Sequence, residues 1–282
     1  MKENRIVSFI IVFLVYVVAT ISGIIVFNNL NFHYAINILI ADIIATVIVY
    51  IFSLIFNNAS VYDPYWSVQP IVIVWLMLFT TEVNTERLLA LIAITLWGVR
   101  LTLNWAYTFK NLLHQDWRYT MLKEKTKTIY PVVNLLGIHM FPTIVVYLCM
   151  LPVIFMYHEN TSFSPLVVLF FTLAVLSFVL QGVSDYQMHK FRKNRSSVFI
   201  RDGLWKYSRH PNYLGEILMW WSIALMCVIS LGGMYNLFLG ALVNTLMFVF
   251  VSIPMAEKHQ ANRKPGFEEY KKETRMLLPI KK

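Results

Sequence analysis

The chain has 282 residues, of which 58% are hydrophobic and 14% are charged, and it carries a formal net charge of +9. Because soluble domains contain about 25% charged residues, this composition excludes an ordinary soluble enzyme and predicts an integral membrane protein. No polar, Gly/Ser-rich or Pro-rich linker divides the sequence, so we predict a single membrane-embedded domain over residues 1–282.

Eight apolar stretches are candidates for membrane helices. They cover residues 6–27, 33–56, 68–80, 88–109, 132–157, 165–184, 213–231 and 234–253. A spanning helix needs about 20 apolar residues, so the stretch at 68–80 either crosses at its limit or forms a re-entrant helix covered by protein. The first stretch is too long for a signal-peptide core and is expected to remain as an anchor. The sequence predicts an all-α membrane bundle of about 7–8 transmembrane helices, two of them within residues 1–56.

The positive charge is concentrated on one side of this predicted topology. If all eight stretches cross and the N-terminus is cytoplasmic, the inner segments hold 22 of the 24 Lys and Arg residues. This asymmetry satisfies the positive-inside rule and predicts a multi-pass protein with both termini in the cytoplasm. Attraction to anionic lipid headgroups accounts for the net charge, so a nucleic-acid partner is not expected.

Several common sites are absent from the sequence. Cys149 and Cys227 lie in apolar runs, which is typical of small buried side chains and indicates neither a disulfide framework nor a zinc site. The sequence contains no G-x-G-x-x-G after a strand, no P-loop, no H-E-x-x-H and no serine nucleophile elbow. A nucleotide, if one binds, is expected among helix ends.

The sixth predicted helix ends in "LSFVLQGVSDYQMHKFRKNR", which places polar residues on one helical face. Gln181, Asp185, His189 and Arg192 follow one another at helical spacing, from the apolar run into the basic loop. A carboxylate near hydrocarbon needs a partner or an aqueous cavity. Asp185 is therefore either paired along its own helix or part of a ligand site.

The stretch "RDGLWKYSRHPNYLGE" leads into the seventh predicted helix. "RDG" predicts a turn with Gly203 at positive φ, and Pro211 fits the first turn of a helix. That helix start offers free N–H groups to an anion. An interfacial belt of aromatic and basic residues is the alternative interpretation, but it does not explain Glu216, an acid inside an apolar run that needs a hydrogen-bond partner or a polar cavity. The candidate ligand-binding residues here are Arg209, His210, Asn212, Tyr213, Glu216 and Trp220.

Two other segments carry candidate residues. After the eighth helix, Glu257 and His259 lie at the same predicted membrane face, followed by "GFEEYKKETRMLLP", which is either part of the site or a surface amphipathic segment. Upstream, Asp63 lies in "VYDPYWSVQP", while Arg100 and Tyr107 share a face of the fourth helix. A mid-helix Arg usually has a partner in the protein, and we expect Asp63 and Arg100 to form a buried pair.

Taken together, these stretches resemble a known membrane family. "GLWKYSRHPNYLGEILMWW", with "SDYQMHKFR" before it and "FEEYKKETRMLLP" after it, is similar to the steroid 5-alpha-reductase-like family, and in particular to its bacterial branch described as a domain of unknown function. "DPYWSVQP" and "LWGVRLTL" resemble earlier motifs of that branch, so the resemblance covers about residues 60–280. "RHPNY" followed by G-E also resembles a stretch of isoprenylcysteine and phospholipid methyltransferases.

The resemblance implies a bundle that binds NADPH near its cytoplasmic face and reduces a carbon–carbon double bond. It also implies a bacterial cell membrane. The residues that match cofactor-contacting positions of the family are Gln181, Asp185, Arg192, Asn212, Tyr213, Glu216, Trp220 and His259. The steroid reductases polarise their substrate with a Tyr and a Glu. Near those positions this sequence has Trp97 and Asp63, which leaves Tyr107 and Tyr65 as possible proton donors.

We therefore expect an NADPH-dependent membrane reductase that acts on an unsaturated lipid-like substrate, with Asp63, Arg100 and Tyr107 as catalytic residues. One alternative is an S-adenosylmethionine-dependent methyltransferase acting on a lipid or a prenylated cysteine. Another is a non-enzymatic lipid-binding or transport protein whose polar rows line a pathway. The expected partners are the bilayer and a hydrophobic small molecule. No metal is predicted, and the sequence leaves the oligomeric state open.

Overall fold

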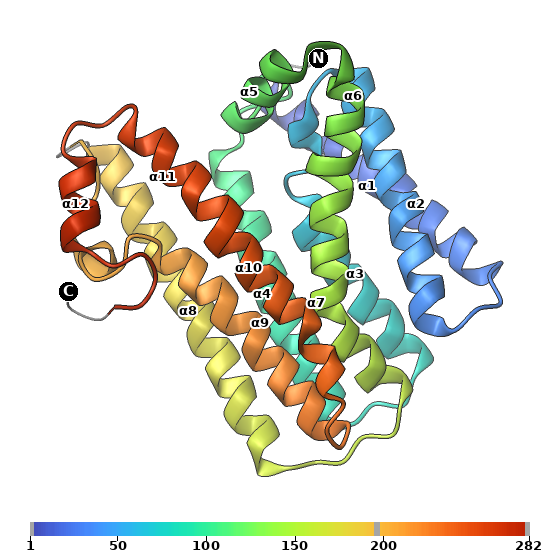
Figure 1. Ribbon diagram of the computed structural model, residues 1–282. Coiled ribbons are helices and arrows are strands. Elements are labelled where there is room, and N and C mark those ends of the chain that lie inside the picture. Colours follow the sequence, from blue (N-terminus) through green and yellow to red (C-terminus); the bar gives the residue numbers. More distant parts are fainter. Residues whose placement is uncertain (1–2, 195–197, 280–282) are drawn as a thin grey trace. The chain divides into compact units, whose positions relative to one another are not determined.

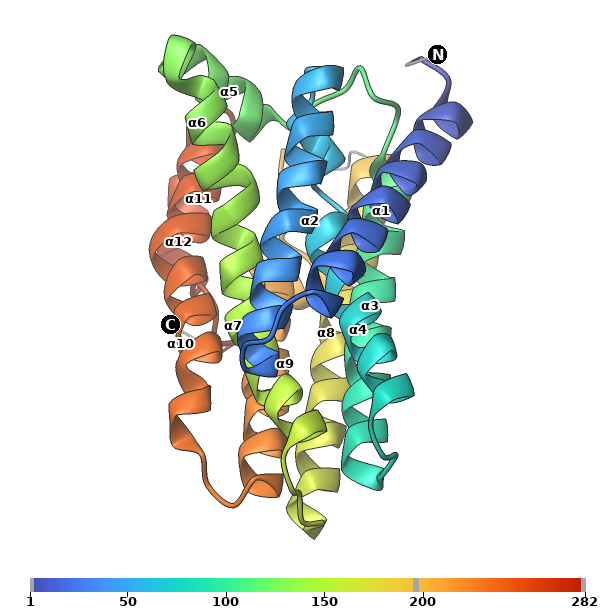
Figure 2. The ribbon, with the colours of Figure 1, turned by 90° about the vertical axis from the view of Figure 1, so that its right-hand side faces the viewer.

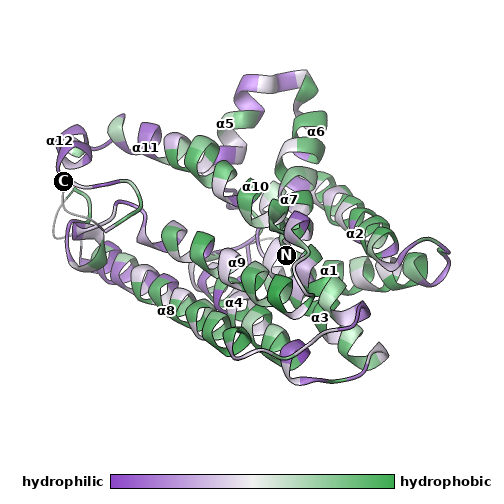
Figure 3. Cartoon of the chain, turned by 60° about the horizontal axis from the view of Figure 1, so that its bottom comes forward, coloured by the Kyte–Doolittle hydropathy of each residue, from purple (hydrophilic) through white to green (hydrophobic). Residues whose placement is uncertain are grey.

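The computed structural model describes residues 3–194 and 198–279, and within those residues all regular elements are helices (Figure 1). The all-α prediction is therefore confirmed. Seven helical stretches of the described residues are long and apolar enough to cross a membrane, which confirms a multi-pass protein. Figure 3 shows apolar residues along the lengths of helices such as α2 and α8, whereas the short α5 and α12 are largely polar.

The chain divides into two compact units. The first unit comprises Met1–Val83 and Ile94–His158. Its helices are α1 (Arg5–Asn28), α2 (Tyr34–Phe56), α3 (Tyr65–Thr80), the later part of α4 (Thr85–Thr108), α5 (Trp117–Thr126), α6 (Tyr130–Val133) and α7 (Phe141–His158). The first two form an antiparallel hairpin (Figure 2). A π-helical turn, Asn134–Met140, joins α6 to α7.

Polar links gather at one end of the first unit. The guanidinium of Arg5 donates to the carbonyl of Ala106 at 2.8 Å. The side-chain amide of Asn58, in the link after α2, donates to the carbonyl of Leu112 at 2.6 Å. The start of α1, the link between α2 and α3, and the end of α4 therefore lie together, so α3 departs from the end to which α4 returns.

The helix α3 is short for a membrane helix. Its 16 residues are about 24 Å long at 1.5 Å per residue, which is less than the hydrocarbon thickness of about 30 Å. The preceding residues 59–62 are buried. The helix therefore begins within the packed part of this unit, and it is not among the seven stretches long enough to cross a membrane.

The second unit comprises Asn84–Ala93 and Glu159–Lys282. It contains the beginning of α4 and the helices α8 (Pro165–Asn194), α9 (Pro211–Ser230), α10 (Leu239–Met247), α11 (Ile253–Ala261) and α12 (Phe267–Glu273). The α8 and α9 helices run side by side (Figure 1). A second π-helical turn, Phe248–Ser252, continues α10 into α11.

The links of the second unit collect at two opposite ends. At one end, the Ser162 N–H donates to the Ser230 carbonyl at 2.9 Å. At the other end, the Arg209 N–H donates to the Arg275 carbonyl at 3.0 Å. The basic segments before α9 and after α11 therefore share an end of this unit. The expected cytoplasmic position of that end stays a prediction.

Candidate functional site

The closest helix contact in the candidate site is where Gln181 of α8 meets Gly215 of α9. A Cβ atom added at Gly215 would lie 2.5 Å from Gln181 Cγ and 2.9 Å from the Ser177 carbonyl oxygen. Only glycine fits there, so Gly215 allows the two backbones to approach. The sequence analysis selected Gln181 but missed Gly215, although a small residue within an apolar helix is a known signal of close packing.

Gln181 is fully buried, and its amide is the least satisfied polar group of this unit. Neither its Oε1 nor its Nε2 has a hydrogen-bond partner among residues 3–194 and 198–279. A buried amide without partners costs about 1–3 kcal/mol, so native proteins rarely retain one without a reason. A ligand carrying both a donor and an acceptor would satisfy it.

The first turn of α9 carries two further candidate residues. Asn212 has a buried Oδ1 that lacks a hydrogen-bond partner in the described part of the chain. Tyr213 stacks on the imidazole of His210, with a centroid distance of 5.3 Å and an interplanar angle of 3°. Pro211 occupies the predicted first turn, and the N-cap residue His210 makes no side-chain capping bond. The helix start thus presents N–H groups and an aromatic face.

Glu216 has a hydrogen-bond partner on its own helix. The indole Nε1–H of Trp220, one turn later, donates to Glu216 Oε1 at 3.0 Å, and both side chains are buried. The carboxylate therefore is not left bare in an apolar run, as the sequence analysis required. This bond holds the two predicted site residues together on the face of α9.

Arg209 and His210 have structural partners. The Nε–H of Arg209 donates to Glu257 Oε1 at 2.7 Å, and His210 Nε2 lies 3.0 Å from the same oxygen. Arg209 also donates through Nη1 to the carbonyls of Lys271, at 3.1 Å, and Thr274. Both partners of this ion pair are about nine-tenths buried. The cluster joins α9, α11 and the C-terminal tail. Arg209, His210 and Glu257 therefore have a structural role in shaping the site, and their polar groups are already bonded within the protein.

The tail folds back on the loop before α9. The Tyr270 hydroxyl donates to the Trp205 carbonyl, and Trp205 Nε1–H donates to the Ser184 carbonyl at 3.2 Å. Gly203 has φ of +60°, which confirms the predicted turn. Burial raises the pKa of Tyr270 to about 12. The tail is therefore a packed part of this unit rather than a detached amphipathic segment.

Two basic residues lie at this end of the unit, the exposed Arg192 at the end of α8 and the half-buried Lys264 after α11. Burial and the nearby positive charge of Arg192 lower the pKa of Lys264. Asp185, His189 and Arg192 all lie on the continuous helix α8, and both charged residues affect the pKa of His189. His259 is half-buried on α11. Because the positive charges of Arg192 and Lys264 repel each other, an anion such as a phosphate bound between them would be stabilised by both.

In the first unit, Asp63 does not pair with Arg100, so that prediction is wrong. Asp63 Oδ1 accepts a hydrogen bond from the Tyr119 hydroxyl at 2.6 Å, and the guanidinium of Arg118 lies nearby. Burial raises the pKa of Asp63 to about 6, against the opposing effects of these two groups. The partners come from α5, which the sequence analysis treated as a cytoplasmic loop. Arg100 is half-buried on α4, and Tyr107 is 69% exposed near its end.

The structure adds a cavity that the sequence analysis missed. It lies between α1, α2 and α3, has a volume of about 290 Å³ and is lined largely by apolar side chains. Asp42 and Gln69 are buried in its wall, and the Tyr65 hydroxyl donates to Asp42 Oδ1 at 3.1 Å. Asp42 Oδ2 and Gln69 Nε2 have no hydrogen-bond partner among the described residues. An acid within the predicted span 33–56 was the signal that could have found this site.

Comparison with known proteins identifies a family for this chain. Residues 49–274 match the family described as "Protein of unknown function (DUF1295)". The chain belongs to the DUF1295 family. The matched region includes both the α8–α9 site and Asp63, whereas Asp42 precedes it. An uncharacterised protein of the fission yeast Schizosaccharomyces pombe, C594.04c, is 24% identical over 253 residues, which cover 79% of this chain and 73% of the yeast protein. No solved structure matches this DUF1295 protein.

Proposed function

We propose that this DUF1295 protein is an NADPH-dependent membrane reductase that reduces a carbon–carbon double bond in an unsaturated lipid-like substrate. The observation that carries the proposal is the buried, unpartnered amide of Gln181, with the unpartnered Oδ1 of Asn212 on the facing helix. The resemblance of the α8–α9 motifs to steroid 5-alpha-reductase-like proteins supports the same activity.

The residues of the second unit fit NADPH. A carboxamide both donates and accepts hydrogen bonds, and so matches the amide of Gln181, while the Asn212 Oδ1 accepts from a hydroxyl or an amide. The start of α9 suits a pyrophosphate. Arg192 and Lys264 would suit the 2′-phosphate, because its negative charge would relieve the repulsion between their positive charges. Arg209 and His210 would position this site through Glu257.

Reduction of an activated double bond consumes one hydride and one proton. When bound, NADPH supplies the hydride. Taken by itself, the first unit offers an apolar cavity between α1, α2 and α3 that would suit the apolar part of a lipid-like molecule, with Asp42 and Tyr65 as polar groups in its wall. Of the catalytic candidates predicted from the sequence, Tyr107 is exposed and Asp63 is bonded to Tyr119, and neither lines this cavity.

The cofactor assignment is tested by thermal unfolding of the detergent-purified protein with NADPH, NADH or S-adenosylmethionine. A ligand at 100-fold above its Kd stabilises the folded state by about 2.7 kcal/mol if it ignores the unfolded chain. We expect NADPH to give the largest shift. The variant Arg192→Ala should weaken NADPH binding by about ten-fold or more, because one charge-assisted hydrogen bond to the 2′-phosphate is lost. NADH lacks this phosphate, so its binding should weaken much less.

The other outcomes of this screen assign other functions. Binding of S-adenosylmethionine without NADPH would replace the reductase by a methyltransferase, which the "RHPNY" stretch also resembles. Binding of neither would favour a lipid-binding or transport protein. Tyr65→Phe should weaken binding of a lipid-like molecule to the cavity of the first unit while leaving NADPH affinity unchanged. Tyr107→Phe is the matched control and should leave both unchanged.

A further inference from the structure

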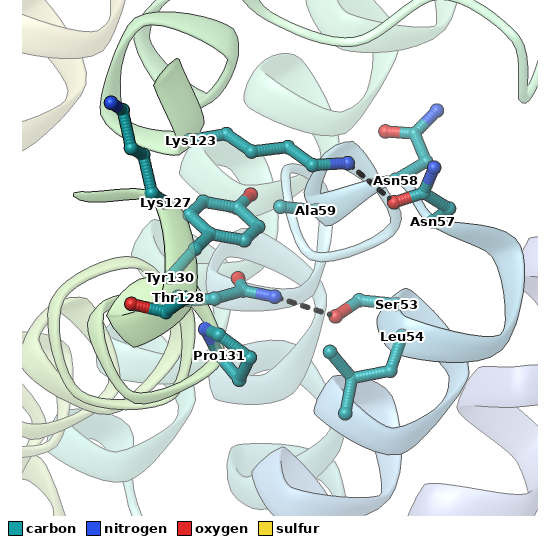
Figure 4. Close-up of a pocket in the computed structure, with 11 residues that line it drawn as sticks. Ser53, Leu54, Asn57, Asn58, Ala59, Lys123, Lys127, Thr128, Tyr130 and Pro131 are labelled. Atoms are coloured by element: carbon teal, nitrogen blue, oxygen red, sulfur yellow. Dashed lines mark hydrogen bonds between the residues drawn. The ribbon is translucent and has the colours of Figure 1, made fainter. Parts of the chain in front are cut away.

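A second pocket in the first unit has a different character from the apolar cavity. It has a volume of about 280 Å³ and lies between the end of α2 and the α5–α6 segment, where the polar links gather. Lys123, Lys127, Asn57 and Asn134 are among the residues that line it (Figure 4). We call it the Lys123 pocket. The proposed reductase activity makes no use of it.

Two buried polar groups in the Lys123 pocket lack partners. Asn134 is 2% exposed, and its Nδ2 donates to Ser53 Oγ at 3.2 Å, which fixes the orientation of the amide. Its Oδ1 then has no donor among the residues that the structure describes, and neither does the buried hydroxyl of Tyr130 have a partner there. Buried groups of this kind are normally satisfied. A ligand with a hydroxyl or amino donor would satisfy Asn134.

The backbone around the Lys123 pocket adopts a rare conformation. Of the described residues other than glycine, only Asn57 and Lys127 have positive φ, at 55° and 46°, and both line this pocket. Asn57, with ψ of 39°, lies in the left-handed helical region that Asn tolerates, whereas Lys127, with ψ of −110°, lies outside it in a sparsely populated region that costs about 1–3 kcal/mol. A strained backbone conformation persists only where the surrounding structure imposes it, and such residues are found preferentially at binding and active sites.

The charge in the Lys123 pocket is positive and is not neutralised by an acid. The ammonium group of Lys123 donates to the neutral amide oxygen of Asn57 at 2.7 Å (Figure 4). The described residues that line the pocket include no Asp or Glu. The side chain of Lys127 is exposed and extends away from Asn57, so it is able to turn toward an anion at the mouth.

Apolar side chains flank this polar pocket on its outer side. Leu54 lines it and is 43% exposed, and Ile51 and Ile55 on the same helix are also exposed. On the other wall, Val132 and Leu136 are exposed next to Pro131 and Asn134. A ligand in the pocket would thus have its polar part among the lysines and asparagines, with apolar surface directly beside it.

We propose that the Lys123 pocket binds the glycerophosphate headgroup of an anionic phospholipid. Its phosphate would lie against Lys123 and Lys127, a headgroup hydroxyl would donate to Asn134 Oδ1, and the acyl chains would follow the exposed apolar residues of α2. A lipid suits the site better than a soluble phosphate ester, because only a lipid would also cover those apolar side chains. Free sn-glycerol 3-phosphate, which has the same headgroup chemistry without acyl chains, is the control that distinguishes a lipid site from a site for a soluble phosphate ester.

The test compares three probes by thermal unfolding of the full-length protein in detergent. The probes are phosphatidylglycerol, phosphatidylcholine and free sn-glycerol 3-phosphate. We expect phosphatidylglycerol to stabilise the protein most, and Lys123→Gln to weaken that binding about ten-fold, as loss of one charge-assisted hydrogen bond does. Lys125→Gln is the matched control, since it removes the same charge from α5 outside the pocket and should retain binding.

Each other outcome overturns the proposal. Equal losses for Lys123→Gln and Lys125→Gln would show general attraction of the basic surface to anionic lipid. Stabilisation by free sn-glycerol 3-phosphate as strong as by the lipid would identify a site for a soluble phosphate ester. No effect of either anion would exclude an anion site. If Lys123→Gln proves unstable, Asn134→Leu provides a second variant, which should lose selectivity for phosphatidylglycerol over phosphatidylcholine.

Discussion

Replacement of Gln181 by Met should make the ligand-free protein more stable and at the same time weaken NADPH binding. Met has the length of Gln without its branching amide, which matters because the side chain packs directly against Gly215. The amide has no partner in the described structure, so its removal should raise the free energy of unfolding by about 1–3 kcal/mol. Few substitutions at a buried position stabilise a protein. An increase in the free energy of unfolding would therefore indicate that Gln181 is retained for ligand binding.

The loss of affinity follows from the same amide. If it exchanges one donated and one accepted hydrogen bond with the cofactor, each worth about 0.5–1.5 kcal/mol, NADPH should bind about 5- to 150-fold more weakly. Thermal unfolding without ligand and titration with NADPH measure the two effects separately. The matched control is Asn244→Leu, which removes another buried, unpartnered Nδ2 in the same unit, on α10. It should stabilise the protein but leave the affinity unchanged.

A destabilised Gln181→Met protein with normal NADPH binding would refute this reasoning. Gln181 would then have a partner in the protein or in a bound water molecule, and its amide would serve packing alone. A variant that gains stability and keeps its affinity would show that the amide is unsatisfied and that the cofactor does not use it.

Three further predictions concern the surrounding structure. Glu257→Ala should cost about 3–5 kcal/mol of unfolding free energy because it leaves Arg209 buried and unpaired, and a double-mutant cycle with Arg209→Met that shows no coupling would contradict the ion pair. The folded-state pKa of Asp63, about 6, lies above its ordinary value, so lowering the pH from 7 to 5 should stabilise the protein, by up to about 3 kcal/mol at still lower pH; Asp63→Asn should abolish that dependence. Single cysteines at Lys125 and Lys264 should be labelled only from the cytoplasmic side in intact cells, and labelling from outside would reject the proposed orientation.

The helices were predictable from the sequence because long apolar runs and their polar ends follow directly from membrane thickness. Even the short α3 was found, but its start was placed too late. Tyr65 and Ser67 lie in a polar, Pro-containing stretch that the sequence analysis interpreted as a link, whereas both are buried within the helix. The π-helical turn at Asn134–Met140 left no recognisable pattern.

The candidate site was predictable where its residues repeat along one helix, and not where they come from distant segments. The row that contains Gln181 and Asp185 follows from helical spacing alone. By contrast, nothing in the local sequence places Tyr119 beside Asp63, 56 positions away. The partner of Arg209 was missed for the same reason, since Glu257 lies 48 positions later. Asp42 had a local signal, an acid in a predicted membrane span, which was passed over.

The bonds between Arg209 and the C-terminal tail set an order of events during synthesis. The carbonyls of Lys271 and Thr274 that accept from Arg209 are made 62 and 65 residues after it. While α9 is being inserted into the membrane, the guanidinium of Arg209 therefore has none of these partners, because Glu257 and the tail have not yet been synthesised. Domains generally fold as units as the chain emerges, so this end of the protein is expected to close only after translation has passed Thr274. A ribosome stalled before that point should hold α8 and α9 in the membrane with the loop before α9 still sensitive to protease.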